Sequence, residues 1–174
     1  MKLIKGILKK ILDVGLQVQL KLGAICLLLI IVTITLGIIS RYVFNSPYVW
    51  TEELGVILFV WIAFLGAGVA AARNRHVAIN LLSQKLPPKI AVVLEFILNI
   101  LILVFLIIMI FGALKLQAVT ANHKSVTLDI PKNVYYLAPL VSGIYMVLVY
   151  IYRSMDLVER GADALQDSSR SAEM

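Results

Sequence analysis

Side chains that could do chemistry are few in this chain, and they gather at the edges of its apolar stretches. The densest group is Arg41, Trp50, Glu52 and Glu53, which flank a short turn around Pro47. An arginine beside two carboxylates forms ion pairs, and these strengthen at a membrane interface because the effective dielectric constant is lower than in water. Carboxylates in the first turn of a helix also suit its dipole. The residues alone leave open whether Glu52 and Glu53 bind a partner protein or serve their own helix.

A catalytic or metal centre has little support in the sequence. The two histidines, His76 and His123, fall in polar segments that the topology argued below places on opposite sides of a membrane. The lone cysteine, Cys26, lies inside an apolar run, where we interpret it as a packing residue rather than a redox thiol. The motifs of hydrolases, metalloproteases, phosphate loops and dinucleotide sites are missing. We therefore expect no catalysis, no metal and no cofactor in this chain.

The elements that position these side chains are four apolar runs without a charged residue. They cover residues 22–40, 54–72, 96–114 and 133–152, each 19 or 20 residues long, in a chain that is 61% hydrophobic and 15% charged. At about 1.5 Å per residue, each run spans a hydrocarbon core of roughly 30 Å. The sequence predicts an all-α membrane protein with four transmembrane helices. Residues 1–163 form a single domain, and the polar tail 164–174 is expected to be disordered.

Lysine and arginine predict the orientation. Of the 16 basic residues, twelve lie before the first run, between the second and third, or after the fourth. Basic residues concentrate in the cytoplasmic segments of membrane proteins. Both termini are therefore predicted to be cytoplasmic. The net charge of +6 follows from this topology, and nucleic-acid binding is unnecessary to explain it.

Residues 1–20 have the pattern of an amphipathic helix. Such a helix binds a phospholipid surface by burying its apolar face and by attracting anionic headgroups. We predict an N-terminal helix on the membrane surface; the alternative is a cytoplasmic extension of the first span. The apolar face comprises Leu3, Ile4, Ile7, Leu8 and Ile11, and the basic face comprises Lys2, Lys5 and Lys9.

The second span carries two further patterns. One face, followed at spacings of three and four residues, predicts contact with another protein; the alternative is a lipid-facing or internal face. Its candidate interface residues, with Arg41 and Glu52 at the edge, are Trp50, Glu53, Ile57, Trp61 and Phe64. Small residues at four-residue spacing favour close approach of helices in lipid. They are Ala63, Gly66, Ala67, Gly68, Ala70 and Ala71.

The centres of the four runs lack ionisable groups. Their deepest polar residues are Thr33, Thr35, Asn99 and Ser142. Ion-coupled transporters keep charged side chains or unwound helices at this depth. We therefore expect that this chain neither transports nor catalyses alone.

Several segments in a fixed order closely resemble the signature of the small membrane subunit of tripartite ATP-independent periplasmic (TRAP) transporters, the DctQ-like family. They are Arg41-Tyr42-Val43-Phe44-Asn45-Ser46-Pro47, Trp50-Thr51-Glu52-Glu53, Phe59-Val60-Trp61-Ile62-Ala63-Phe64-Leu65-Gly66 and His76-Val77. Leu128-Asp129-Ile130-Pro131, followed by Tyr136 and Pro139, is similar to the start of that family's fourth helix. The resemblance covers nearly the whole chain. Asp129 stands where the family's motif varies, and no role is assigned to it.

The resemblance implies a non-catalytic scaffold and docking subunit in the bacterial inner membrane. The implied partners are a large membrane subunit with an elevator-type transport domain and a periplasmic binding protein that delivers an organic anion, such as sialic acid or a C4-dicarboxylate. Transport would be sodium-coupled, with sodium bound only in the large subunit. The substrate itself is not encoded in this chain.

Two other functions remain as alternatives. A small four-helix exporter acting as a homodimer would need an embedded acidic residue, and Glu52 and Glu53 lie close to the membrane boundary. A membrane-embedded enzyme would need a clustered catalytic set. Solute flux by this chain alone would favour the exporter.

Overall fold

The computed structural model describes residues 2–73, 88–125 and 127–172. These contain four helices: α1 (Lys2–Tyr42), α2 (Val49–Ala72), α4 (Pro88–Thr120) and α5 (Asn133–Ala172). Each has a stretch long and apolar enough to cross a membrane. The predicted all-α membrane fold with four spans is confirmed. His76 and the rest of its loop lie outside the described residues.

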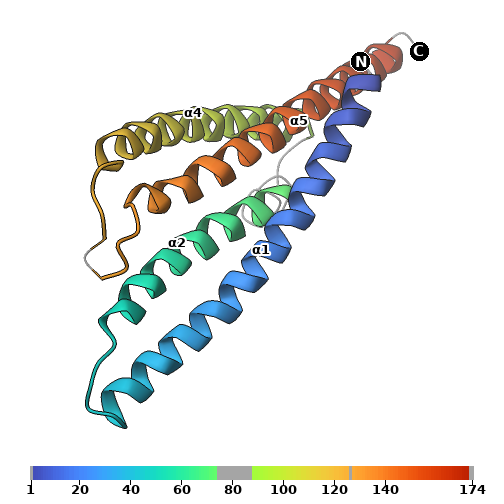
Figure 1. Ribbon diagram of the computed structural model, residues 1–174. Helices are drawn as coiled ribbons and strands as arrows, with labels where there is room; N and C mark the ends of the chain where they lie inside the picture. Colours follow the sequence, from blue (N-terminus) through green and yellow to red (C-terminus); the bar gives the residue numbers. More distant parts are fainter. Residues whose placement is uncertain (1, 74–87, 126, 173–174) are drawn as a thin grey trace.

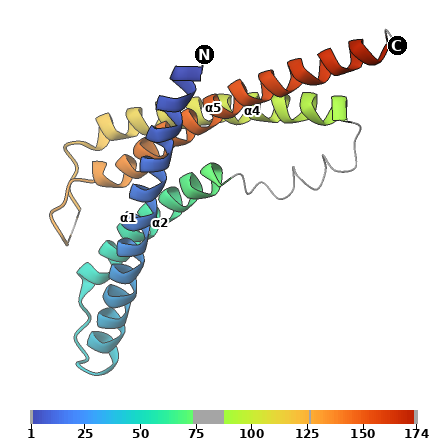
Figure 2. The same ribbon diagram turned by 90° about the vertical axis from the view of Figure 1, so that its right-hand side faces the viewer.

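The four helices form two antiparallel hairpins that cross (Figures 1 and 2). In one hairpin α1 packs along α2, and in the other α4 packs along α5. Helix α5 also contacts α2 and α1, whereas α4 packs only against α5 among the described helices. Helix α5 is therefore the centre of the molecule.

The apolar core lies where the hairpins cross. Three helices and the start of α1 meet there, with a cluster of buried residues: Leu12, Ala71, Leu106, Tyr145, Met146, Val149 and Tyr150. The Tyr145 ring lies against Gly15, and its hydroxyl donates a hydrogen bond to the Leu12 carbonyl at 3.0 Å. A side chain at position 15 would meet that ring, since an added Cβ would lie 2.5 Å from it. Glycine is thus what lets α1 approach α5.

The N-terminal surface helix predicted for residues 1–20 is not confirmed as an element of its own. Helix α1 runs from Lys2 to Tyr42 without a break, because no proline or cap interrupts it where the apolar run begins. Leu12 belongs to the core and Leu8 packs against it, while Ile7 and Ile11 stay exposed. Part of the predicted membrane-facing surface thus packs against this protein's own helices.

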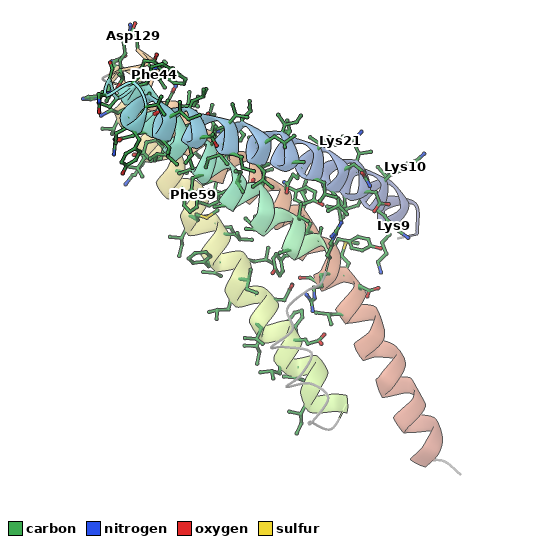
Figure 3. All side chains as sticks on the ribbon, turned by 90° about the horizontal axis from the view of Figure 1, so that it is seen from below. Lys9, Lys10, Lys21, Phe44, Phe59 and Asp129 are labelled. Carbon is green, nitrogen blue, oxygen red and sulfur yellow. The ribbon has the colours of Figure 1, made fainter. Side chains whose placement is uncertain are left out.

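The remaining predicted residues of that segment are placed only in part. Lys2, Leu3 and Ile4 lie in α1, but their side chains are outside the described set. Lys5 is half-buried, and Lys9 is exposed. Lys9, Lys10 and Lys21 follow α1 away from the end that carries Phe44 and Asp129 (Figure 3).

Helix α5 also extends further than the apolar run that predicted it. It continues to Ala172 and so includes residues 164–172 of the tail for which the sequence predicted disorder. Alanine, leucine and arginine recur beyond Tyr152, and all three favour helix. Proline is missing from that stretch, so nothing in its composition forces the helix to end.

Candidate functional site

The candidate residues gather at one end of the molecule, where α1 joins α2 and α4 joins α5. We call this the loop end and define it by residues 41–53 and 121–132. Phe44 and Asp129 overlap in the view of Figure 3, but they lie on different connections, and Figures 1 and 2 show the α1–α2 turn set apart from the α4–α5 connection. The crossing is not the only contact between the two hairpins, because Glu53 of α2 also bonds to Thr127 in the α4–α5 connection.

The α1–α2 turn is built around Ser40, which is almost fully buried. Its carbonyl accepts a hydrogen bond from the amide of Ser46 at 3.1 Å, and its hydroxyl accepts one from the amide of Tyr48 at 3.2 Å. Asn45 takes a left-handed conformation with φ of 49°, which asparagine tolerates better than most residues. The turn sets where Arg41 and Glu52 stand.

Glu52 reaches back to α1. Its carboxylate accepts a hydrogen bond from the Arg41 guanidinium, so the two form an ion pair. Both side chains are more than half exposed, at 56% and 65%. An ion pair this exposed contributes at most about 1 kcal/mol in water. Its geometry fixes the first two helices relative to each other at their ends.

Glu53 reaches forward to the α4–α5 connection. Its carboxylate accepts a hydrogen bond from the Thr127 amide at 3.1 Å, across 74 positions of sequence. Adjacent residues of a helix point about 100° apart, because a turn takes 3.6 residues. The two neighbouring carboxylates therefore hold two different elements of this chain, and their contact with a partner protein stays a prediction.

The connection that Glu53 holds is itself ordered by local bonds. Ser125 donates its amide to the Ile130 carbonyl at 2.8 Å, and Lys132 donates its amide to the His123 carbonyl at 2.9 Å. Asp129 has a φ of 52° and forms an ion pair with Lys124 at 2.9 Å. Asp129 thus has a structural role in a turn, which the sequence analysis did not assign.

The remaining candidate interface residues of α2 do not share one environment. Ile57 is buried within the chain, so it has no surface for a partner. Trp50, Trp61 and Phe64 are half-buried, and the Trp50 ring stacks on Tyr48 at 6.3 Å between centroids. Contact of Trp61 and Phe64 with another protein stays a prediction.

The small residues of α2 divide in a similar way. Gly68 lies against Gln19 of α1, where an added Cβ would be 2.1 Å from the glutamine side-chain oxygen, and Ala71 joins the core. The other four small residues are exposed on the helix: Ala63, Gly66, Ala67 and Ala70. Close approach of helices within the chain therefore uses two of the six.

Comparison with known proteins decides the family. The sequence model of the tripartite ATP-independent periplasmic transporters, DctQ component, matches residues 30–160, which include the whole loop end. This chain belongs to the DctQ family. The resemblance noted in the sequence is thereby confirmed.

Curated relatives agree with this assignment. A putative TRAP transporter small permease protein of Haemophilus influenzae is 32% identical over 132 residues, covering 76% of this chain and 82% of the relative. The sialic acid TRAP transporter small permease protein SiaQ of Vibrio cholerae is 31% identical over 133 residues, 76% of this chain and 75% of the relative. The sialic acid TRAP transporter permease protein SiaT of Haemophilus influenzae is 47% identical over 53 residues, 30% of this chain but 9% of that permease.

This DctQ component is therefore a small permease subunit of a TRAP transporter and a multi-pass membrane protein. Subunits of this family are permease components and not enzymes. They work with a large permease subunit and a periplasmic binding protein.

Two contacts inside this DctQ component were not foreseen from its sequence. The Asn99 side-chain amide of α4 donates hydrogen bonds to the Tyr150 carbonyl, at 3.1 Å, and to the Ser154 hydroxyl of α5. Asn99 stood out as a deep polar residue, and polar side chains join helices in lipid. The contact between Tyr145 and Gly15 had no such signal, since neither residue type is unusual where it occurs.

Proposed function

We propose that this DctQ component is the scaffold and docking subunit of a sodium-coupled transporter that imports an organic anion across the bacterial inner membrane. Both termini lie in the cytoplasm, and the loop end faces the periplasm. The sodium sites belong to the large permease subunit. This chain itself binds no sodium and no cofactor.

One observation carries the scaffold role. The apolar runs contain no aspartate, glutamate, lysine, arginine or histidine, and the interhelical polar contacts described above join the chain's own helices. Coupled transport requires charged or unwound sites near the middle of the bilayer. The chemistry of transport is thus expected in the partner, while this chain holds four helices in a fixed arrangement.

The docking role is supported by the loop end. Two connections from different hairpins are tied together there by Glu53, so they present one surface rather than two independent loops. Tyr42, Val43 and Phe44 are strongly exposed on it, and exposed apolar side chains are typical of protein-binding surfaces. Apart from Arg41, the basic residues of α1, such as Lys9 and Lys10, lie toward the other end of the helix, as cytoplasmic segments require (Figure 3).

Sialic acid is the first substrate to test, because the names of SiaQ and SiaT specify it. The experiment uses proteoliposomes holding the large subunit alone, this chain alone, or both, each with the periplasmic binding protein outside. Uptake is expected only with both membrane subunits, the binding protein and a sodium gradient. C4-dicarboxylates, with their cognate binding protein, are the comparison substrates.

Each component of the proposal has its own negative result. Uptake at the full rate by the large subunit without this chain would contradict the proposed scaffold role. Uptake without a sodium gradient would contradict the proposed sodium coupling. Solute flux by this chain alone would favour the homodimeric exporter instead.

A further inference from the structure

A cavity at the loop end is not explained by the scaffold role. It has a volume of 260 Å³ and lies between the last turns of α1 and the first turn of α2. That volume is just below the roughly 300 Å³ at which small-molecule sites begin. It suits the polar head of a larger molecule whose remainder lies outside.

One wall of the cavity is a single face of α1. Ile34, Gly37, Ile38 and Arg41 line it, at spacings of three, four and seven residues. Gly37 closes the gap to α2, since an added Cβ would lie 2.7 Å from the Thr51 hydroxyl oxygen. Ile34 and Ile38 stay half exposed, so the wall continues outward as an aliphatic groove.

The Arg41–Glu52 ion pair forms the polar side of the cavity. The contact between them joins one guanidinium nitrogen to one carboxylate oxygen. A guanidinium has five N–H donors and a carboxylate has two acceptor oxygens, so each group can take a second partner. A ligand that matches this site carries a negative and a positive group side by side.

The distance from the charged to the apolar part also restricts the ligand. Seven helical residues separate Ile34 from Arg41, which is about 10.5 Å along the axis. That is most of one leaflet, because half of a hydrocarbon core is roughly 15 Å. The occupant therefore has a zwitterionic head at the interface and an aliphatic chain that enters the same leaflet.

We propose that this cavity binds a phospholipid with a primary ammonium headgroup, the phosphatidylethanolamine class. The phosphate accepts hydrogen bonds from Arg41, the ammonium donates to Glu52, and an acyl chain lies along Ile38 and Ile34. Such a lipid would fill the space between the last turns of α1 and the first turn of α2, which approach each other at Gly37 and at the ion pair. The inference adds a lipid site to the loop end and does not depend on which solute is transported.

The test uses the full chain purified with its large membrane subunit and stripped of lipid in detergent. Bound lipids are counted by native mass spectrometry during titration with phosphatidylethanolamine, phosphatidylcholine or phosphatidylglycerol. Phosphatidylcholine keeps the phosphate but has no ammonium N–H, and phosphatidylglycerol has no ammonium. One site is expected to prefer phosphatidylethanolamine over both.

Substitutions of Arg41 and Glu52 should change the lipid affinities in different ways. Arg41→Gln is expected to weaken all three lipids at this site, by about ten-fold, because each loses its phosphate partner. Glu52→Gln should lower the affinity for phosphatidylethanolamine to that for phosphatidylcholine, while phosphatidylcholine binding changes little. Arg41→Lys keeps a positive charge and should retain part of the binding.

Lys124→Gln is the matched control, because Lys124 also forms an exposed ion pair at the loop end but does not line the cavity. It should leave all three affinities unchanged. Equal binding of the three lipids by the unaltered complex would overturn the proposal. So would equal loss of all three in both Arg41→Gln and Glu52→Gln, since the ion pair would then only hold the helices.

Discussion

The two places where the hairpins meet are held by opposite kinds of contact. At the crossing, large apolar side chains of α5 pack into the surface of α1 and α2, and a glycine brings α1 close to a tyrosine ring. At the loop end, the partly exposed Glu53 carboxylate accepts a few hydrogen bonds from Ser125, Thr127 and Leu128 of the α4–α5 connection. A packed contact resists displacement because it has to be rebuilt as a whole. A few hydrogen bonds to a partly exposed carboxylate break at smaller cost.

The difference between the packed crossing and the hydrogen-bonded loop end suits the two tasks proposed for this subunit. The crossing sets the angle between the hairpins, and the loop end adjusts around it. A subunit that braces a moving partner requires the first property, and one that receives a docking protein benefits from the second. The three changes below test the contrast, from the strongest contact to the weakest.

Gly15→Leu should have the largest effect. Its side chain would enter the space of the Tyr145 ring, and overpacking of this kind costs about 2 kcal/mol or more. The thermal stability of the purified subunit in detergent should fall clearly. Gly6→Leu is the control, because an added Cβ at Gly6 meets nothing within 4 Å.

A double variant tests whether the clash with the Tyr145 ring causes the loss of stability in Gly15→Leu. In Gly15→Leu with Tyr145→Ala, the leucine has room, so the double variant should be no less stable than Tyr145→Ala alone. Strictly additive losses would mean that the two residues do not meet, and equal stability of the Gly15 and Gly6 variants would count against the crossing as the rigid contact.

Asn99→Leu should have an intermediate effect. It removes the hydrogen bonds from α4 to Tyr150 and Ser154 of α5, and interhelical hydrogen bonds in membranes average about 0.6 kcal/mol. Stability against denaturing detergent measures the loss. Thr35→Val is the control, because the Thr35 hydroxyl bonds only within α1, to the Ile31 carbonyl at 2.7 Å. A similar loss in both variants would assign the effect to polarity rather than to the α4–α5 contact.

The sequence predicted the helices much better than their contacts. Four apolar runs follow directly from the cost of exposing polar groups to lipid, so their number and positions were predictable. The limits of α1 and α5 were not, because helix continues wherever nothing ends it, and only the structure shows one helix from Lys2 to Tyr42. Tyr145 and Gly15 are 130 positions apart, and no single-sequence pattern pairs them.

The loop end was predicted in part. The concentration of Arg41, Glu52 and Glu53 marked it, since charges beside an apolar run are conspicuous. An ion pair of Arg41 with one of the two carboxylates was expected, and Arg41 pairs with Glu52. The partner of Glu53 was not foreseen, because the Thr127 amide has no side-chain signature. The left-handed turn at Asp129 had a signal in its residue type, as aspartate tolerates that conformation, but it was left without a role.

Glu53→Ala should have the smallest effect on the whole protein and a clear local one. The Thr127 amide loses its acceptor, so hydrogen exchange at that amide should be several-fold faster. Global stability should change little, since the crossing is untouched. Hydrogen–deuterium exchange of the peptide that covers Thr127 measures the effect.

Glu53→Gln should have an intermediate effect on this exchange rate, because its side-chain amide oxygen can still accept the hydrogen bond. Glu52→Ala should leave Thr127 unchanged, because Glu52 bonds to Arg41 on the other side of the helix. Equal acceleration in the two alanine variants would mean that the loop end loosens as one unit, and the separate roles of the neighbouring carboxylates would be wrong.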